Sequence, residues 1–264
     1  MVDASGDALD DQLDYTVDLS DEKVEESEIP SRKRKAESGP ASRKKAKKTE
    51  SKVPVGQRAI REQLEEIERC HKKSKPHLSG FELEELSLHS DDMVDAQLFK
   101  NERTLDHLAS FVKFATKNYK AKLLKAPNEE TPKGSPLVLI MTGSAIRATD
   151  IIRALEELKR SGKIAKLFAK HLKVAQQIGY LKSNVVNIGV GTASRLSKLI
   201  AEDALKLDRL ETLILDCVPD KKNLHLFQLE NGTDIFELLD THIVPAARAR
   251  KEDQEAERLR VALF

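Results

Sequence analysis

The stretch LVLIMTGS, residues 137–144, decides the fold of this chain. Its first five residues form a continuous apolar run, which is typical of a short strand buried on both faces of a sheet. The segment that follows has apolar residues at helical spacing from Ile146 to Leu158 and ends at Gly162. This order predicts a buried strand, a turn, and then a helix that packs against the sheet.

The same alternation continues downstream. Short apolar runs at 164–168, 185–190 and 213–216 predict three more strands, and the segments 174–181 and 194–202 have helical periodicity. Strands that alternate with helices predict an α/β fold, with a mostly parallel sheet and helices on both faces. Ligands of such folds bind at the carboxyl ends of the strands. Those ends are residues 142–144, 169–171, 191–192 and 216–217.

Composition divides the chain into four segments. Residues 1–54 hold few large apolar side chains and predict a disordered tail. Residues 55–134 predict a helical lead-in, and its second helix, expected over 91–124, either packs against the next domain or binds a partner. Residues 135–247 predict the α/β domain. The charged residues 248–264 predict a solvated C-terminal helix.

The tail divides into an acidic block and a basic block. Residues 2–28 contain eleven acids and one base, whereas residues 32–52 contain ten bases and two acids. Two basic clusters on flexible chain are typical of a bipartite nuclear import signal. The same side chains could bind RNA phosphates, or they could simply be solvated. The clusters are Arg32, Lys33, Arg34 and Lys35, followed by Arg43, Lys44, Lys45, Lys47 and Lys48.

Cysteine usage and hydropathy exclude several classes of protein. Cys70 and Cys217 are far apart and lie in no ligand motif, so we expect no disulfide framework, no cysteine-based zinc site and no other metal or cofactor. The amino terminus lacks the pattern of a signal peptide, and no run approaches the ~18 apolar residues of a membrane helix. We therefore expect a soluble protein of a reducing, intracellular compartment.

Three segments resemble, in the same order, motifs of one lobe of the DEAD-box RNA helicases. Residues 185–199 resemble the Thr-Pro-Gly-Arg segment, and residues 137–155 resemble the strand and helix of the Pro-Thr-Arg-Glu-Leu-Ala motif. Residues 207–216 resemble the approach to the Asp-Glu-Ala-Asp box. The resemblance covers about residues 137–240 and implies a RecA-like lobe. It rests on Gly191-Thr192-Ala193-Ser194-Arg195-Leu196 and on Leu207-Asp208-Arg209-Leu210.

The parts that such a helicase needs for ATP hydrolysis are missing. No Gly-rich phosphate loop precedes Leu137, and the pair Gly162-Lys163 lacks both the earlier Gly and the following Ser or Thr. Cys217 stands where the Glu that orders the attacking water would be, and the chain ends before a Ser-Ala-Thr motif or a second lobe. We therefore predict no catalysis. Asp216 is interpreted as a relic with a structural hydrogen bond rather than as a magnesium ligand.

The acidic-then-basic tail, the helical lead-in, the single degenerate lobe and residues 166–171 together resemble the Cms ribosomal small-subunit homologue family. The resemblance implies a factor of the nucleus and nucleolus that acts with the small-subunit processome in pre-rRNA processing and 90S pre-ribosome assembly. Its implied partners are pre-ribosomal RNA and processome proteins, with no membrane and no small-molecule substrate.

The helicase motifs also indicate which residues would contact RNA. Loop amides at the start of a helix, together with a cationic side chain, suit a phosphate. The alternative is that these residues only maintain the fold, with Ser194 as a helix cap and Arg195 as a surface ion. The first candidate group is Thr192, Ser194 and Arg195, and the second is Thr142, Gly143, Ser144 and Arg147.

Three functions stay open at this point. The leading hypothesis is a non-catalytic assembly factor that binds RNA through the helicase-like lobe. The second is a protein scaffold of the pre-ribosome without RNA contact. The third is an enzyme with residual ATP-dependent, helicase-like activity, which the missing phosphate loop makes the weakest of the three.

Overall fold

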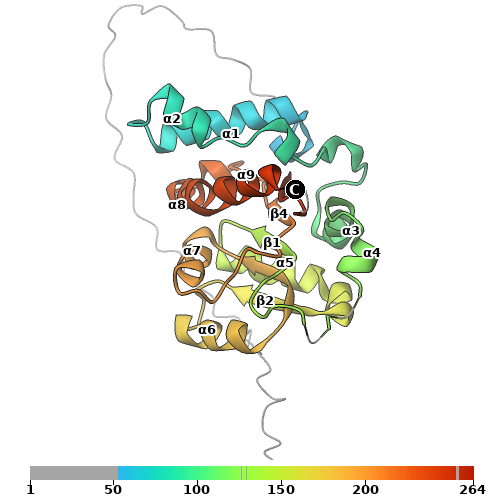
Figure 1. Cartoon of the computed structure of the whole chain (residues 1–264). Coiled ribbons are helices and arrows are strands. Elements are labelled where there is room, and N and C mark those ends of the chain that lie inside the picture. The colour runs from blue at the N-terminus through green and yellow to red at the C-terminus, as the bar shows by residue number, and fades with distance from the viewer. Residues whose placement is uncertain (1–52, 126, 129, 254–255) are drawn as a thin grey trace, which may run out of the picture. The chain divides into compact units, whose positions relative to one another are not determined.

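Five parallel strands form the sheet around which the protein is built (Figure 1). The computed structural model describes residues 53–125, 127–128, 130–253 and 256–264, except for the side chains of residues 160 and 161. The predicted tail, apart from its last two residues, and both basic clusters lie outside the described residues. The strands are β1 (Val138–Met141), β2 (Lys163–Leu167), β3 (Val186–Gly191), β4 (Thr212–Leu215) and β5 (Arg260–Leu263).

The strand order is β2-β3-β1-β4-β5, and every neighbouring pair is parallel. Strand β1 is central, so that Val138 lies beside Ile188 on one side and Thr212 on the other. All residues of β1, β3 and β4 are buried. Because both faces of these strands are covered, every position is buried, and this explains the continuous apolar runs in the sequence.

Helices connect the strands in the predicted order. After β4, a helix, a π-helical turn (Leu239–Ile243) and a second helix follow one another without a break. The helices of this part are α5 (Ala145–Ala154), α6 (Val174–Ser183), α7 (Ala193–Ala201), α8 (Gly232–Leu238) and α9 (Val244–Glu252). The lead-in contains α1 (Ile60–Ser74), α2 (Gly80–Glu85), α3 (Leu105–Ala115) and α4 (Tyr119–Lys122).

Both faces of the sheet are covered by helices. Leu139 and Met141 of β1 pack in one large apolar cluster with residues of α1, α7, α8 and α9. Because side chains alternate along a strand, Val138 and Ile140 point to the opposite face. On that face α5 packs against β3 and α3 packs against α5. The predicted fold class, a parallel α/β sheet with helices on both faces, is confirmed.

The lead-in packs against the sheet and shares its core. Helix α1 contacts α8, and the backbone N–H of Val94 donates to the carbonyl of Val261, 2.8 Å away, beside an isolated parallel bridge between Met93 and Val261. This bridge covers the outer edge of β5. The predicted boundary at residue 135 therefore does not separate two cores, and the described residues belong to one compact unit.

The prediction of one long helix over residues 91–124 is wrong. The segment contains two short 3-10 turns (Ser90–Asp92 and Ala96–Leu98) before α3, and a break at residues 116–118 before α4. Local hydrogen bonds compete with the helix. The Asp95 carboxylate accepts from the N–H of Gln97, and the backbone of Asn118 is left-handed.

The prediction of a C-terminal helix over residues 248–264 is also wrong. Helix α9 ends at Glu252, and residues 260–263 form β5 beside β4. Charge alternation between Arg248 and Glu257 suggested a solvated helix, but the final apolar residues satisfy the open edge of β4. The N–H of Cys217 donates to the carbonyl of Phe264, 3.0 Å away. Within the described part of the chain, no helix is long and apolar enough to cross a membrane.

Candidate functional site at the carboxyl edge of the sheet

A cleft of about 660 Å³ opens where β1 and β4 end. This is the place where parallel α/β sheets bind ligands, because loops from neighbouring strands meet at the carboxyl edge. Three chain segments form the walls: the β1–α5 loop with the first turn of α5, the segment after β4, and the residues before α8. The lining includes Thr142, Gly143, Ser144, Arg147, Asp216, Lys221, Lys222, Gln228, Glu230 and Asn231.

The β1–α5 loop is shaped by a helix cap and a glycine. Ser144 is the N-cap of α5, and its hydroxyl accepts from the backbone N–H of Arg147 at 3.2 Å. Gly143 allows the opposite wall to approach, because a Cβ at this position would lie 2.2 Å from Cδ1 of Leu229. The amide of Asn231 donates to the carbonyl of Gly143, which closes the contact.

Asp216 lies at the base of this cleft and is held from two sides. Arg147 donates to both carboxylate oxygens, with Nε 2.8 Å from Oδ2 and Nη2 2.9 Å from Oδ1. The hydroxyl of Thr142 also donates to Oδ2, at 2.9 Å. The hydrogen bonds from Arg147 to Asp216 raise the pKa of the guanidinium above its usual value. The structural hydrogen bond predicted for Asp216 is present.

The segment after β4 brings cations to the cleft. Asp220 accepts from the backbone N–H groups of Lys222 and Leu224, which folds residues 220–224 into a tight turn. The side chains of Lys221 and Lys222 are exposed and, among the described residues, form no ion pair. Sequence reasoning missed both lysines as candidate contacts, although a Lys-Lys pair in the loop that follows a buried strand is a visible signal.

The first candidate group lies beside the second at the same edge. The N–H of Thr142 donates to the carbonyl of Gly191, so the β1 and β3 loops leave the sheet next to each other. Thr192, rather than Ser194 as expected, is the N-cap of α7. Gly191 is required here because a Cβ would lie 2.2 Å from the carbonyl oxygen of Leu167. The side chain of Ser194 is exposed.

Arg195 is a buried side chain and not the surface ion that was one of its two interpretations. It is 9% exposed, and its Nη1 donates to the carbonyl of Leu172 at 2.9 Å and to Oε1 of Gln177 at 2.7 Å. Burial lowers its pKa. Its guanidinium therefore supports the segment after β2. The predicted RNA contact of Arg195 stays untested.

The exposed cation nearest in sequence to the end of β2 is Lys170. Ala169, Lys170 and His171 are exposed, and His171 has a left-handed backbone with φ of 57°. Lysines thus follow two strands, β2 and β4, while the starts of α5 and α7 follow the two strands between them. The four carboxyl ends form one continuous edge in the order β2-β3-β1-β4.

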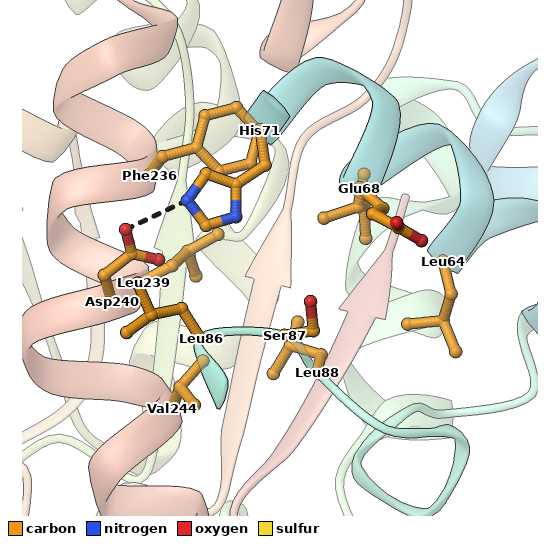
Figure 2. Close-up of a pocket in the computed structure, with 11 residues that line it drawn as sticks. Leu64, Glu68, His71, Leu86, Ser87, Leu88, Phe236, Leu239, Asp240 and Val244 are labelled. Carbon is orange, nitrogen blue, oxygen red and sulfur yellow. Dashed lines mark hydrogen bonds and ion pairs between the residues drawn. The ribbon is translucent and has the colours of Figure 1, made fainter. Parts of the chain in front are cut away.

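A second, much smaller cavity of about 60 Å³ lies between α1 and the helical run after β4 (Figure 2). At one end His71 stacks on Phe236, with ring centroids 4.5 Å apart, and its Nε2 lies 3.0 Å from Oδ2 of Asp240. Lys75 also donates to Oδ2. The cavity has room for about two water molecules. Its polar groups tie α1 to the π-helical turn, which is a structural role.

Three side chains outside the cleft meet the requirements of metal ligands. One ligand atom each from Glu66, Cys70 and His225 lies within 4.8 Å of the other two. Sequence reasoning did not bring these three residues together, because residues 66 and 70 are separated from residue 225 by most of the chain.

The sheet, its carboxyl-edge cleft and an acidic residue neutralised by arginine define an α/β protein of the parallel-sheet class with a candidate binding edge. The chain belongs to the CMS1 family: the model of that family, described as "U3-containing 90S pre-ribosomal complex subunit", matches residues 16–256. This confirms the resemblance inferred from the sequence. The family description supports a role in ribosome biogenesis.

Several curated proteins are similar to the chain. Protein CMS1 of Chaetomium thermophilum is 38% identical over 141 residues, which are 53% of this chain and 54% of that protein. Protein CMSS1 of Xenopus laevis is 35% identical over 174 residues, 65% of this chain and 59% of that protein, and the Homo sapiens protein is 32% identical over 185 residues, 69% and 61%. The matched part thus spans between half and about three fifths of these relatives.

A solved structure, that of the yeast DEAD-box splicing factor Prp28, is 14% identical with a TM-score of 0.35. It covers 59% of this chain and 31% of that chain. A similarity this distant carries no information on function.

Proposed function

We propose that this chain is a non-catalytic factor of small-subunit assembly that binds the backbone of pre-ribosomal RNA across the carboxyl edge of its sheet. The family to which the chain belongs is described as a subunit of a U3-containing 90S pre-ribosomal complex. Processome proteins are then its other partners, and the nucleus and nucleolus its compartment. The predicted import signal in the two basic clusters would deliver it there.

The observation that carries the RNA contact is the pattern of charge along the edge. Lys170, Lys221 and Lys222 are exposed at its two ends. Between them lie the starts of α5 and α7, whose first N–H groups and positive dipole ends favour a phosphate. This pattern supports a backbone path over Ser144 and Ser194. Arg147 and Arg195 hold the loops in place, because each donates hydrogen bonds to acceptors inside the protein.

The absence of catalysis in this proposal rests on residues at the edge. Both oxygens of Asp216 already accept hydrogen bonds, and the neighbouring position holds a buried thiol, Cys217, in place of a carboxylate. No Gly-rich loop with a following Lys-Ser or Lys-Thr occurs anywhere in the sequence. These features favour a binding protein over an ATPase.

The test compares two charge reversals of equal size. The edge variant carries Lys170→Glu, Lys221→Glu and Lys222→Glu, and the control carries changes at exposed lysines that do not follow the strand ends, Lys125→Glu, Lys133→Glu and Lys182→Glu. Both are made in the full chain with the nine basic cluster residues changed to Gln, because those residues would bind RNA by themselves. Affinity for a labelled 20-nucleotide single-stranded RNA is measured by fluorescence anisotropy at several salt concentrations.

We expect the edge variant to lose at least ~10-fold in affinity and to reduce the slope of log affinity against log salt by about 2–3, since three phosphate contacts are removed. The control should change affinity by less than about two-fold. Equal losses in both variants, or no RNA binding by the chain with an intact edge, would refute the proposal.

Protein scaffolding is the second candidate, and one observation favours it. Phe81, Leu98 and Ile146 are 70%, 65% and 67% exposed, which is unusual for large apolar side chains and suits protein contacts. Crosslinking in cells, with sequencing of attached RNA, separates the two functions. Enrichment of pre-ribosomal RNA supports the proposal. Recovery of assembly proteins with no RNA above background supports a scaffold instead.

A further inference from the structure

We propose that Glu66, Cys70 and His225 form a zinc site that fastens α1 to the chain segment after β4. None of the three residues lines the cleft at the carboxyl edge. Each supplies a ligand type that Zn²⁺ prefers: a carboxylate oxygen, a thiolate sulfur and an imidazole nitrogen.

Helix spacing and the fold bring the ligands together. Glu66 and Cys70 are four residues apart in α1, so their side chains lie on the same face of the helix. His225 directly precedes the short 3-10 turn Leu226–Gln228, which contacts α1. Nε2 of His225 lies 2.9 Å from Oε1 of Glu66, and Sγ of Cys70 lies 3.5 Å from the same oxygen. The Sγ–Oε1 distance is that of two ligands of one tetrahedral ion, whereas the Nε2–Oε1 contact is a direct hydrogen bond that the ion would replace.

The site is built into the interior of the protein. Cys70 is 4% and His225 is 8% exposed, so neither is a surface ligand. Nδ1 of His225 has no hydrogen-bond partner among the described residues, although it is buried. This nitrogen is not the proposed ligand atom, so an ion held by Nε2 leaves it to an ordered water.

The surroundings shift the pKa values of the three side chains in different directions. Burial alone would raise the pKa of Glu66, but hydrogen bonds from Arg69 and His225 outweigh it and lower the pKa to about 2, so the carboxylate is charged. Burial lowers the pKa of His225, although the hydrogen bond to Glu66 acts in the opposite direction. Burial, followed by the charge of Glu66, raises the pKa of Cys70 to about 12, so the metal-free site holds a thiol.

Zinc binding then has a defined proton balance. The Zn²⁺–sulfur bond replaces the S–H bond of Cys70, and that proton leaves to solvent. The proton on Nε2 of His225 moves to Nδ1, which frees Nε2 as a ligand. Arg69 donates from Nε to Oε2 and from Nη2 to Oε1 of Glu66, so it orients the carboxylate, and its bond to Oε1 must yield to the ion. A water molecule completes the coordination.

A bound ion here would also act on the cleft. Gln228 donates to Oε1 of Glu66 at 3.4 Å and lines the cleft at the carboxyl edge, as does Leu226. Fixing His225 to α1 therefore fixes the wall of the cleft opposite the β1–α5 loop.

The test uses the purified full chain, freed of metal by chelation and then titrated with Zn²⁺ in competition with a chromogenic chelator. A parallel titration with Co²⁺ reports the thiolate directly through its sulfur-to-cobalt charge-transfer absorption. The ligand variants are Glu66→Gln, Cys70→Ser and His225→Gln. Cys217→Ser is the matched control, since Cys217 is an equally buried cysteine outside the three-residue set.

We expect one zinc ion per chain, a charge-transfer band that is lost in Cys70→Ser but kept in Cys217→Ser, and a loss of affinity of at least ~10-fold in the other two ligand variants. Circular dichroism of the metal-free variants shows whether they fold. If Cys70→Ser does not fold, Glu66→Gln, which keeps the side-chain size, is the variant that tests the site. Substoichiometric zinc, a band that survives Cys70→Ser, or a band lost only in Cys217→Ser would overturn the site. None of these outcomes depends on RNA binding.

Discussion

Replacing Arg147 by methionine should destabilise the protein by removing the ion partner of a buried carboxylate. Asp216 is 5% exposed, and Arg147 supplies two of its three hydrogen bonds. Breaking a buried pair from one side costs about 3–5 kcal/mol, because the other charge is left without compensation. The side chain of Arg147 is 26% exposed and the bond from Thr142 persists, so we expect about 2–3 kcal/mol.

The magnitude can be measured by urea unfolding followed by circular dichroism, with thermal unfolding as a second readout. For a unit of this size the expected loss corresponds to a Tm lower by roughly 4–12 °C. The informative comparison is a double-mutant cycle with Asp216→Asn. A neutral amide costs less to bury unpaired than a carboxylate, so the double variant should be more stable than the sum of the single losses predicts.

Two results would contradict this reasoning. One is a loss below about 0.5 kcal/mol in Arg147→Met, which would mean that water replaces the arginine without penalty. The other is strict additivity in the cycle, which would mean that the two side chains do not stabilise each other. RNA affinity should change little in Arg147→Met at temperatures where it is folded, because the lysines of the edge carry the proposed contact.

Two further predictions follow from other buried groups. The pKa of Glu66 is lowered from 4.5 to about 2 on folding, so its carboxylate contributes stability that is complete above pH 4.5 and is lost as the pH falls toward 2. The contribution is about 2–3 kcal/mol, and unfolding midpoints of the metal-free wild type and Glu66→Gln should converge over this pH range; parallel curves would show that Glu66 is not stabilised as an anion. Arg195→Met leaves the amide oxygen of Gln177 and the carbonyl of Leu172 without this donor, and should lower the free energy of unfolding by about 1–3 kcal/mol with unchanged affinity for single-stranded RNA. Lost affinity at unchanged stability would instead make Arg195 the RNA contact that the helicase motif suggested.

Much of the fold could be predicted from the sequence, because the signals are local. The runs at 164–168, 185–190 and 213–216 are continuous and apolar, and the structure has strands within one residue of them. A strand covered on both faces must be apolar at every position, so its composition alone indicates that it is buried. The helix after residue 144 was equally visible, since its periodicity is local.

The errors lie where long-range contacts overrule local pattern. Residues 260–263 are too few to distinguish a strand from the end of a charged helix, and only the open edge of β4 decides between them. The lead-in likewise looked like a separate helical region. Packing against the next domain was one of its two interpretations, and the structure shows how it occurs, with Met93 and Val94 beside Val261.

The candidate site divides in the same way. The helicase-like motifs indicated the correct strand ends, but whether a cation faces solvent depends on its neighbours. Arg195 and Lys170 are both cations close to the carboxyl end of a strand, yet Gln177 and Leu172 enclose the first and leave the second exposed. Whether a side chain is buried depends on how the chain packs, whereas the residue type determines only the free-energy cost of burying it.

The sequence by itself determined that this chain folds as a parallel α/β sheet, that it lacks a phosphate loop, and that it resembles the family described as a 90S pre-ribosomal complex subunit. Each of these conclusions depends on neighbouring residues or on motif order. The tertiary structure alone decided that Arg147 neutralises Asp216, that the two chain ends of the compact unit share one core, and that Glu66 and Cys70 meet His225. Such pairings join residues that are distant in sequence, so local sequence propensity cannot predict them.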